Sequence, residues 1–185
     1  MKRTRIAPTA AVMALLAALG GVAVAAQDRY ALEVKGGLAF SEFRGYEDWQ
    51  TVAVSQSGNM IETILGNPAM IEAYKAGIPG NGKPFPDGAK MAKIHWNAKK
   101  GAEEPGNPTI PDTLHDVDFM AKDSKKFADS GGWGYAEFEY DAAADTFRPG
   151  DLTDKPPQGN DARCGLACHT IAASKDYVFT AYPKR

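Results

Sequence analysis

The chain contains only two cysteines, Cys164 and Cys168, and a histidine, His169, directly follows the second. Two nearby thiols with an adjoining imidazole are typical of a c-type haem attachment site. There the thiols add to the haem vinyl groups and the histidine ligates the iron. The usual spacing is C-x-x-C-H, whereas three residues separate the cysteines here. The segment therefore favours covalently attached haem, with one extra residue between the thiols.

Three other uses of these cysteines stay open at this point. In an exported protein two cysteines commonly form a disulfide, and four positions apart on a helix their Cα atoms lie about 6 Å apart, which a disulfide permits. A zinc site would need Cys164, Cys168, His169 and one of the distant His95 or His115. No second C-x-x-C or H-x-x-x-H pattern supports zinc. The third alternative is a pair of free structural thiols.

The first 26 residues have the organisation of a secretory signal peptide. Lys2, Arg3 and Arg5 precede a wholly apolar run over 10–19, and small residues at 23–25 suit a signal peptidase. The apolar run is too short for a membrane span. We therefore expect an exported, periplasmic chain without a membrane span after processing. Export places the cysteines outside the cytoplasm, where c-type haem is attached in bacteria.

The remaining residues, 27–185, are enough for one domain with a core of its own. The whole chain has 21 basic and 23 acidic residues, and the signal segment contains three of the basic ones and none of the acidic ones. The mature protein is therefore mildly acidic, which argues against nucleic acid as a partner. Small uncharged or cationic ligands fit this charge better.

Alternation of apolar and polar residues predicts most of the secondary structure. Strands are expected at 49–56, 60–65, 89–96, 113–121 and 133–140, with a last β-rich piece at 177–182. Helices are expected after Asn67-Pro68 up to Gly77, over 124–129, and from Cys164 through Ala173. We expect loops at 77–88, 97–111 and 141–161. This mixed order without βαβ alternation predicts an α+β domain, mostly antiparallel β-sheet with a few short helices.

The expected strand at 89–96 separates its side chains into two sets. Met91, Lys93 and His95 share one face, and Ile94 and Trp96 share the other. By this pattern alone Lys93 points away from the apolar face and would be a solvated lysine of the sheet.

Several short segments occur in an order that is specific as a set. They are Glu47-Asp48-Trp49, Asn67-Pro68 with Ile71 to Tyr74, Phe85-Pro86-Asp87-Gly88 followed by Lys93, Ala121 to Ala128, Gly132 to Tyr135, and Asp176 to Thr180 after the cysteine motif. From Trp49 to Tyr182 this order resembles the cytochrome P-460 family, which includes the cytochromes c′-beta. The resemblance strengthens the haem interpretation of the cysteine segment.

The resemblance implies a small periplasmic monohaem c-type cytochrome with the haem packed against the sheet, a five-coordinate iron held by His169, and a homodimer. It also implies two alternative functions. Cytochromes P-460 oxidise hydroxylamine and carry a lysine bonded to the haem, whereas cytochromes c′-beta lack that bond and bind gases such as nitric oxide. The family's lysine lies five residues after the glycine of an Asp-Gly turn. Counting from Gly88 makes Lys93 the expected haem-contacting residue.

An open iron position opposite His169 would accept a small nitrogenous ligand, hydroxylamine or nitric oxide. Oxidation of hydroxylamine needs a base, and our candidates are Glu137 and Glu139, which share a strand face with Trp133 and Tyr135. Both glutamates could equally be solvated sheet residues.

Two further points stay open from the sequence. The first is whether the protein is an enzyme, delivering electrons to a redox partner protein, or only binds gas. The second is whether the protein is instead an electron carrier, which would need a sixth iron ligand such as Met91 or Met120.

Overall fold

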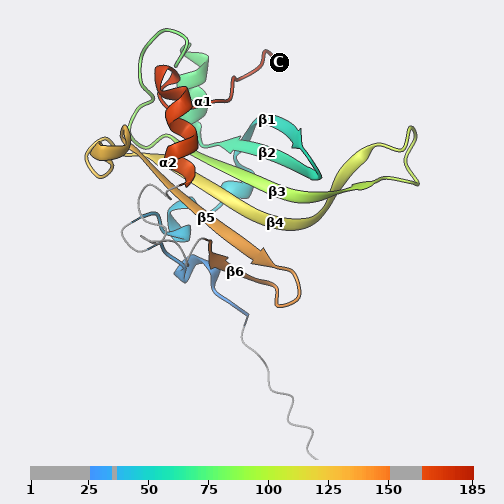
Figure 1. Ribbon diagram of the computed structural model, residues 1–185. Helices are drawn as coiled ribbons and strands as arrows, with labels where there is room; N and C mark the ends of the chain where they lie inside the picture. Colours follow the sequence, from blue (N-terminus) through green and yellow to red (C-terminus); the bar gives the residue numbers. More distant parts are fainter. Residues whose placement is uncertain (1–25, 35–36, 151–163) are drawn as a thin grey trace, which may run out of the picture.

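The computed structural model describes residues 26–34, 37–150 and 164–185. Six antiparallel strands form one sheet in the order in which they follow along the chain (Figure 1). They are β1 (Gln50–Ser57), β2 (Met60–Gly66), β3 (Lys90–Lys100), β4 (Thr109–Lys122), β5 (Trp133–Asp141) and β6 (Thr146–Pro149). The α+β class with an antiparallel sheet and a few short helices is confirmed.

Local sequence explains the first two connections. Gly58 adopts a positive φ of 57° in the tight turn between β1 and β2, a conformation that glycine adopts without a steric penalty. Helix α1 (Pro68–Lys75) begins where expected, because the Asn67 side chain accepts a hydrogen bond of 3.0 Å from the Met70 amide. The second helix, α2 (Cys164–His169), continues into the 3₁₀ helix η5 (Thr170–Lys175).

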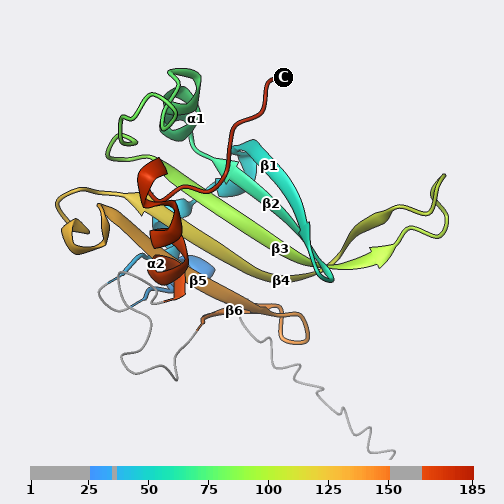
Figure 2. The same ribbon diagram turned by 45° about the horizontal axis from the view of Figure 1, so that its top comes forward.

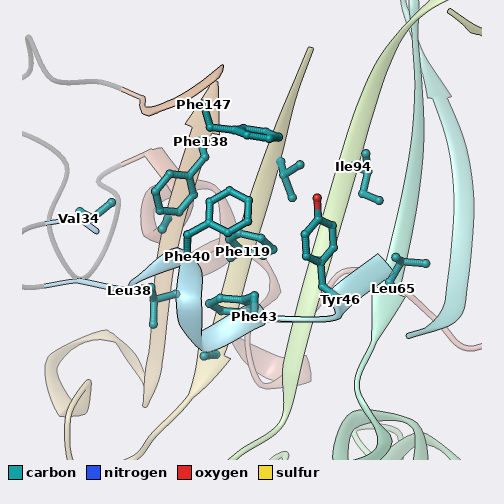
Figure 3. Close-up of a cluster of buried hydrophobic side chains, with 14 of the residues drawn as sticks. Val34, Leu38, Phe40, Phe43, Tyr46, Leu65, Ile94, Phe119, Phe138 and Phe147 are labelled. Carbon is teal, nitrogen blue, oxygen red and sulfur yellow. The ribbon is translucent and has the colours of Figure 1, made fainter. Parts of the chain in front are cut away.

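One face of the sheet is covered by the N-terminal segment. The 3₁₀ helices η2 (Phe40–Phe43) and η3 (Tyr46–Asp48) place aromatic rings against Phe119 and Phe138 (Figure 3), and η1 (Arg29–Ala31) places Tyr30 against Phe40. Phe40 is fully buried and makes ring contacts with five other aromatic residues, among them Phe119 at 5.2 Å. On β3 this cluster includes Ala92 and Ile94, whose side chains point away from the face that carries Met91, Lys93 and His95.

The opposite face carries a second cluster, built from α1, the segment before β3 and the C-terminal segment. Val52, Met70, Ala89 and Trp133 are its most buried members, and Phe85 and Val178 are almost as buried. Helix α2 lies against this face over β5 (Figure 1). The sheet is therefore packed on both sides, and α2 and the C-terminal segment meet the face that bears Met91 and Tyr135.

Three expected segments differ from the structure. Residues 97–111 are not all loop, because β3 and β4 continue pairing as far as Lys100 and Thr109 and form a projecting arm (Figure 2). Part of the expected loop at 141–161 is strand β6. The expected β-rich piece at 177–182 forms no strand, because Asp176 and Tyr177 have positive φ values of 50° and 64° and turn the chain across the sheet instead.

The helical turn expected at 124–129 begins as a turn and becomes the 3₁₀ helix η4 (Ala128–Ser130). The expected signal peptide lies outside the described residues, apart from residue 26. Among the helices that the structure describes, none is long and apolar enough to cross a membrane.

Candidate functional site

His169 is held at the end of α2 by a single hydrogen bond. Its Nδ1 lies 2.6 Å from the main-chain oxygen of Tyr177, so Nδ1 carries the proton and donates it. This leaves Nε2 as the nitrogen with a free lone pair. Burial lowers the pKa of His169, and the positive charge of Lys93 acts in the same direction. The imidazole is therefore neutral and oriented, as a metal-ligating histidine must be.

The Tyr177 carbonyl is itself fixed by Asp176. One oxygen of the Asp176 carboxylate accepts a 2.7 Å hydrogen bond from Lys122 Nζ, and the other accepts one of 2.7 Å from the Phe85 amide. Lys122 Nζ also donates to the Gly131 carbonyl at 2.9 Å. Three separate segments thus converge on the turn whose carbonyl orients His169.

A cavity of about 530 Å³ lies between α2, the C-terminal segment and the sheet. Its volume is in the range of cofactor and ligand sites. Cys168, His169 and Phe179 line one side of it, and the strands contribute the other side. The strand residues are Ser55, Glu62, Ile64, Met91, Lys93, Asp118, Phe119, Met120, Tyr135, Ala136 and Glu137. The face of β3 that carries Met91 and Lys93 is therefore a cavity wall.

Lys93 lies in this wall and is ion-paired. Its Nζ is 3.2 Å from Oε2 of Glu62, which also accepts a 2.7 Å hydrogen bond from the Ser55 hydroxyl. Burial of Glu62 acts to raise its pKa, but the hydrogen bonds from Ser55 and Lys93 outweigh it and leave the pKa below its ordinary value. Glu62 is therefore an anion that forms an ion pair with Lys93 in the same wall of the cavity.

Asp118 is the carboxylate that sequence reasoning missed as a site residue. It pairs with Lys93 in the antiparallel register and lines the cavity. Its side chain keeps 44% of its surface accessible because it borders the cavity, while the surrounding protein still holds it away from bulk water. Burial, with the negative charge of Asp116 added to it, raises the pKa of Asp118 to about 6. The sequence signal that could have identified Asp118 was the strand alternation, which places it on the same face as Met120.

The two glutamates chosen from the sequence have different environments. Glu137 lines the cavity and lies opposite Asp118 in the register of β4 and β5. Glu139 lies two pairs further along, opposite Asp116, and forms an ion pair with Arg148 of β6. Glu139 is not among the residues that line the cavity. The structure therefore brings Glu137, but not Glu139, together with His169 and Lys93.

The family model of cytochrome P460 matches residues 43–180, which is most of the chain. The chain belongs to the cytochrome P460 family. No curated protein matches the chain. Membership of the cytochrome P460 family implies a haem cofactor. The resemblance identified from the sequence is confirmed.

The residues around the cavity of this cytochrome P460 fit a haem. The oriented imidazole of His169 is a suitable iron ligand, and Cys168 is an exposed free thiol in the cavity wall. Ile64, Met91 and Met120 offer apolar surface to the flat macrocycle. The buried hydroxyl of Tyr135 has no hydrogen-bond partner among the described residues, so a polar group of the ligand can satisfy it. The side chain of Cys164 lies outside the described part.

The zinc alternative is not supported by the placement of the distant histidines. His95 and His115 both direct Nδ1 to the carboxylate of Asp116. Neither histidine lines the cavity that contains Cys168 and His169.

Helix α2 approaches β5 closely at Gly165. A Cβ atom at this position would lie 2.9 Å from Cβ of Tyr135, closer than such atoms are found in proteins. Glycine therefore allows the cysteine helix to lie directly on the strand. Gly165 is one of the three residues that separate Cys164 from Cys168.

Proposed function

We propose that this cytochrome P460 binds haem c through thioether bonds from Cys164 and Cys168, with His169 as the proximal iron ligand, and oxidises hydroxylamine or a related nitrogen compound. The observation that carries the enzymatic proposal is Asp118, a cavity carboxylate whose pKa is raised to about 6. A base with such a pKa is poised near neutral pH. Asp118 thus takes the role expected of a glutamate.

The residues in the two walls of the cavity have different roles in the proposed reaction. Bound haem supplies the iron that binds nitrogen and accepts electrons. His169, in the α2 wall, would hold the haem iron, and Asp118 and Glu137 lie in the strand wall of the same cavity, where they would act on a ligand bound there. At pH 7 about nine tenths of a group with a pKa of about 6 is ionised, so the Asp118 carboxylate can accept a proton from the substrate. Glu137 adds a second acceptor beside it.

Lys93 is the proposed site of the bond to the haem macrocycle. Joining its nitrogen to a haem carbon replaces an N–H and a C–H bond by a C–N bond, which releases two protons and two electrons. The reaction therefore needs an oxidant such as a peroxide. The amine must also lose its positive charge before it can act as a nucleophile. Glu62, 3.2 Å away, is placed to accept that proton.

The same ion pair favours a second candidate function. An ammonium group paired with a carboxylate is not a nucleophile, so Lys93 would form no bond to the haem while this ion pair with Glu62 persists. The protein would then bind nitric oxide without turnover, as a cytochrome c′-beta does. We further propose that the chain is exported to the periplasm and acts as a homodimer. The enzymatic form would pass its electrons to a redox partner protein.

Spectroscopy and mass analysis of purified holoprotein test this proposal. We expect haem that stays on the band in denaturing electrophoresis, a ferrous form that binds carbon monoxide, and hydroxylamine oxidation coupled to an acceptor dye. A haem peptide that also contains the Lys93 segment would establish the macrocycle bond. Lys93→Ala should then remove that segment and the oxidase activity. Colourless protein with a disulfide between Cys164 and Cys168 would refute the haem proposal.

Identical haem-peptide masses and spectra for wild type and Lys93→Ala would show that no such bond exists. Together with carbon monoxide binding and no turnover, this result would identify a gas-binding cytochrome. A six-coordinate low-spin spectrum that is indifferent to carbon monoxide would instead identify an electron carrier.

A further inference from the structure

A row of polar side chains leads from the cavity wall to the protein surface across β2, β3 and β4. It begins at Glu62 in the cavity wall, passes through His95 and Asp116, and ends at His115. The side chains of His95 and Asp116 are each 8% exposed, whereas that of His115 is 50% exposed. The row therefore runs from the cavity wall through a buried region to an exposed end at His115.

Each inner member of the row contacts its two neighbours through different atoms. Nε2 of His95 lies 3.8 Å from Oε1 of Glu62, and Nδ1 of His95 hydrogen-bonds to Oδ1 of Asp116. The other oxygen of Asp116, Oδ2, lies 2.5 Å from Nδ1 of His115. The 3.8 Å separation is longer than a hydrogen bond, so proton transfer at this step requires the Glu62 carboxylate to move closer to Nε2 of His95. A proton can thus enter each group on one side and leave on the other.

We propose that Glu62, His95, Asp116 and His115 form a proton relay that carries protons between the haem cavity and solvent. This proposal rests on the proposed function, because oxidation of hydroxylamine and formation of the Lys93 bond both release protons in the cavity. A proton taken up by Glu62 moves to Nε2 of His95, and the proton on Nδ1 passes to Asp116. His115 is exposed and exchanges protons with solvent, so that its Nδ1 loses its proton and its Nε2 carries one. The Asp116 carboxyl group then turns and protonates Nδ1 of His115, which releases its Nε2 proton to solvent. One proton enters and one leaves.

The charges around the row favour a histidine that can carry a proton. Burial acts to lower the pKa of His95, but the hydrogen bond to Asp116 and the charge of Asp118, whose Oδ2 lies 4.0 Å from Nδ1, raise it above the ordinary value. The other charged groups facing His95 are Lys93 on its own strand and Glu62 on β2.

The next strand along, β5, places Glu137 opposite Asp118 and Glu139 opposite Asp116. Asp116 has a pKa below its ordinary value. Its burial opposes this shift, but the hydrogen bonds and charges of His95 and His115 outweigh the burial. The protonated Asp116 is therefore the least favourable state of the relay.

His115→Gln is the variant of choice, because His115 is at the surface and its replacement leaves the buried groups in place. We expect its hydroxylamine oxidation to slow about tenfold in dilute buffer, with a larger solvent deuterium isotope effect. Imidazole added to the buffer should restore the rate. Asp112→Asn is the matched control, since Asp112 is an exposed carboxylate on the same strand, paired with Lys99 outside the row. The control should behave like wild type.

A second measurement does not depend on hydroxylamine turnover. Rapid reduction of the ferric holoprotein, followed by a pH-indicator dye, reports the rate and the number of protons taken up. We expect His115→Gln and Asp116→Asn to lower the rate while the number of protons per haem stays the same. If wild type does not oxidise hydroxylamine but shows this slowed uptake in the variants, the proposed enzyme activity fails and the relay stands.

Three results would overturn the relay. The first is a wild-type protein that exchanges no proton on reduction. The second is a pair of variants whose proton uptake keeps the wild-type rate, or whose activity is lost without rescue by imidazole and without an isotope effect. The third is a metal ion, in addition to the haem iron, bound by His95, Asp116 and Asp118, whose ligand atoms lie within 4.8 Å of one another.

Discussion

At the scale of single residues, the chemistry depends on where each carboxylate lies relative to the cavity. Asp118 is half ionised at about pH 6 and loses its charge progressively below that pH, because burial raises its pKa to about 6. The rate of hydroxylamine oxidation should therefore fall as the pH drops through about 6. Asp118→Asn should lower kcat/KM by about 10²- to 10⁴-fold, the usual contribution of a general base, and remove this acid limb. The acid limb is measured in a pH series of kcat at saturating hydroxylamine, because free hydroxylamine is itself protonated in this pH range and adds its own limb to kcat/KM.

Glu139→Gln provides the matched control for Asp118. It removes a carboxylate from the same face of the sheet, but Glu139 is paired with Arg148 and lies outside the cavity lining. We expect activity within twofold of wild type, since surface charge changes of this kind have small effects. An acid limb in kcat at saturating hydroxylamine that persists in Asp118→Asn would exclude Asp118 as the base.

Asp176 is a positioning residue, since it acts on the iron ligand through the Tyr177 carbonyl. Its side chain is 13% exposed and that of its partner Lys122 is 6% exposed, so Asp176→Ala leaves a buried lysine without its ion pair. We expect a loss of about 3–5 kcal/mol in the free energy of unfolding, measured in urea. The iron–histidine stretching frequency should also shift, because His169 loses its fixed acceptor. A stable variant with an unchanged frequency would contradict this role.

At the scale of elements, the contact between α2 and β5 depends on the absence of a side chain at position 165. Alanine within a helix normally stabilises a protein by about 0.5–1 kcal/mol relative to glycine. Gly165→Ala should do the opposite, because its Cβ would approach Cβ of Tyr135 to 2.9 Å and displace the helix that bears the cysteines. We expect a lower melting temperature and a lower haem content per chain.

Ala167→Ser is the control for this helix. Ala167 is exposed on the same helix, so the substitution should leave haem content and melting temperature unchanged. Equal or higher stability of Gly165→Ala would show that α2 does not need this close approach.

At the scale of the whole molecule, the two faces of the sheet have separate tasks. The cluster around Phe40 lies on the face opposite the cavity. Among the aromatic residues of this cluster, only Phe119 also lines the cavity. Phe40→Ala should cost about 3–5 kcal/mol in the free energy of unfolding while the haem spectrum of the folded protein stays that of wild type. Chemical unfolding and optical spectra test this. A changed spectrum would mean that the two faces are coupled.

The sequence alone was sufficient for features that depend on local pattern. Strand alternation placed Met91, Lys93 and His95 on one face, and the Asn67 cap set the start of α1. The adjacency of Cys168 and His169 pointed to the cofactor that family membership implies. These features are encoded within a few consecutive residues, so they can be recognised without knowing which segments meet.

Only the tertiary structure decided which residues share the site. The pairing of Lys93 with Asp118, and the contact of His95 with Glu62 and Asp116, depend on strand register between segments far apart in the chain. Residues 177–182 were wrongly expected to be β-rich, because alternation does not reveal the left-handed backbone at Asp176 and Tyr177. That turn delivers the carbonyl that orients His169. Residue pattern is local, whereas register and long-range hydrogen bonds arise only when the chain is packed.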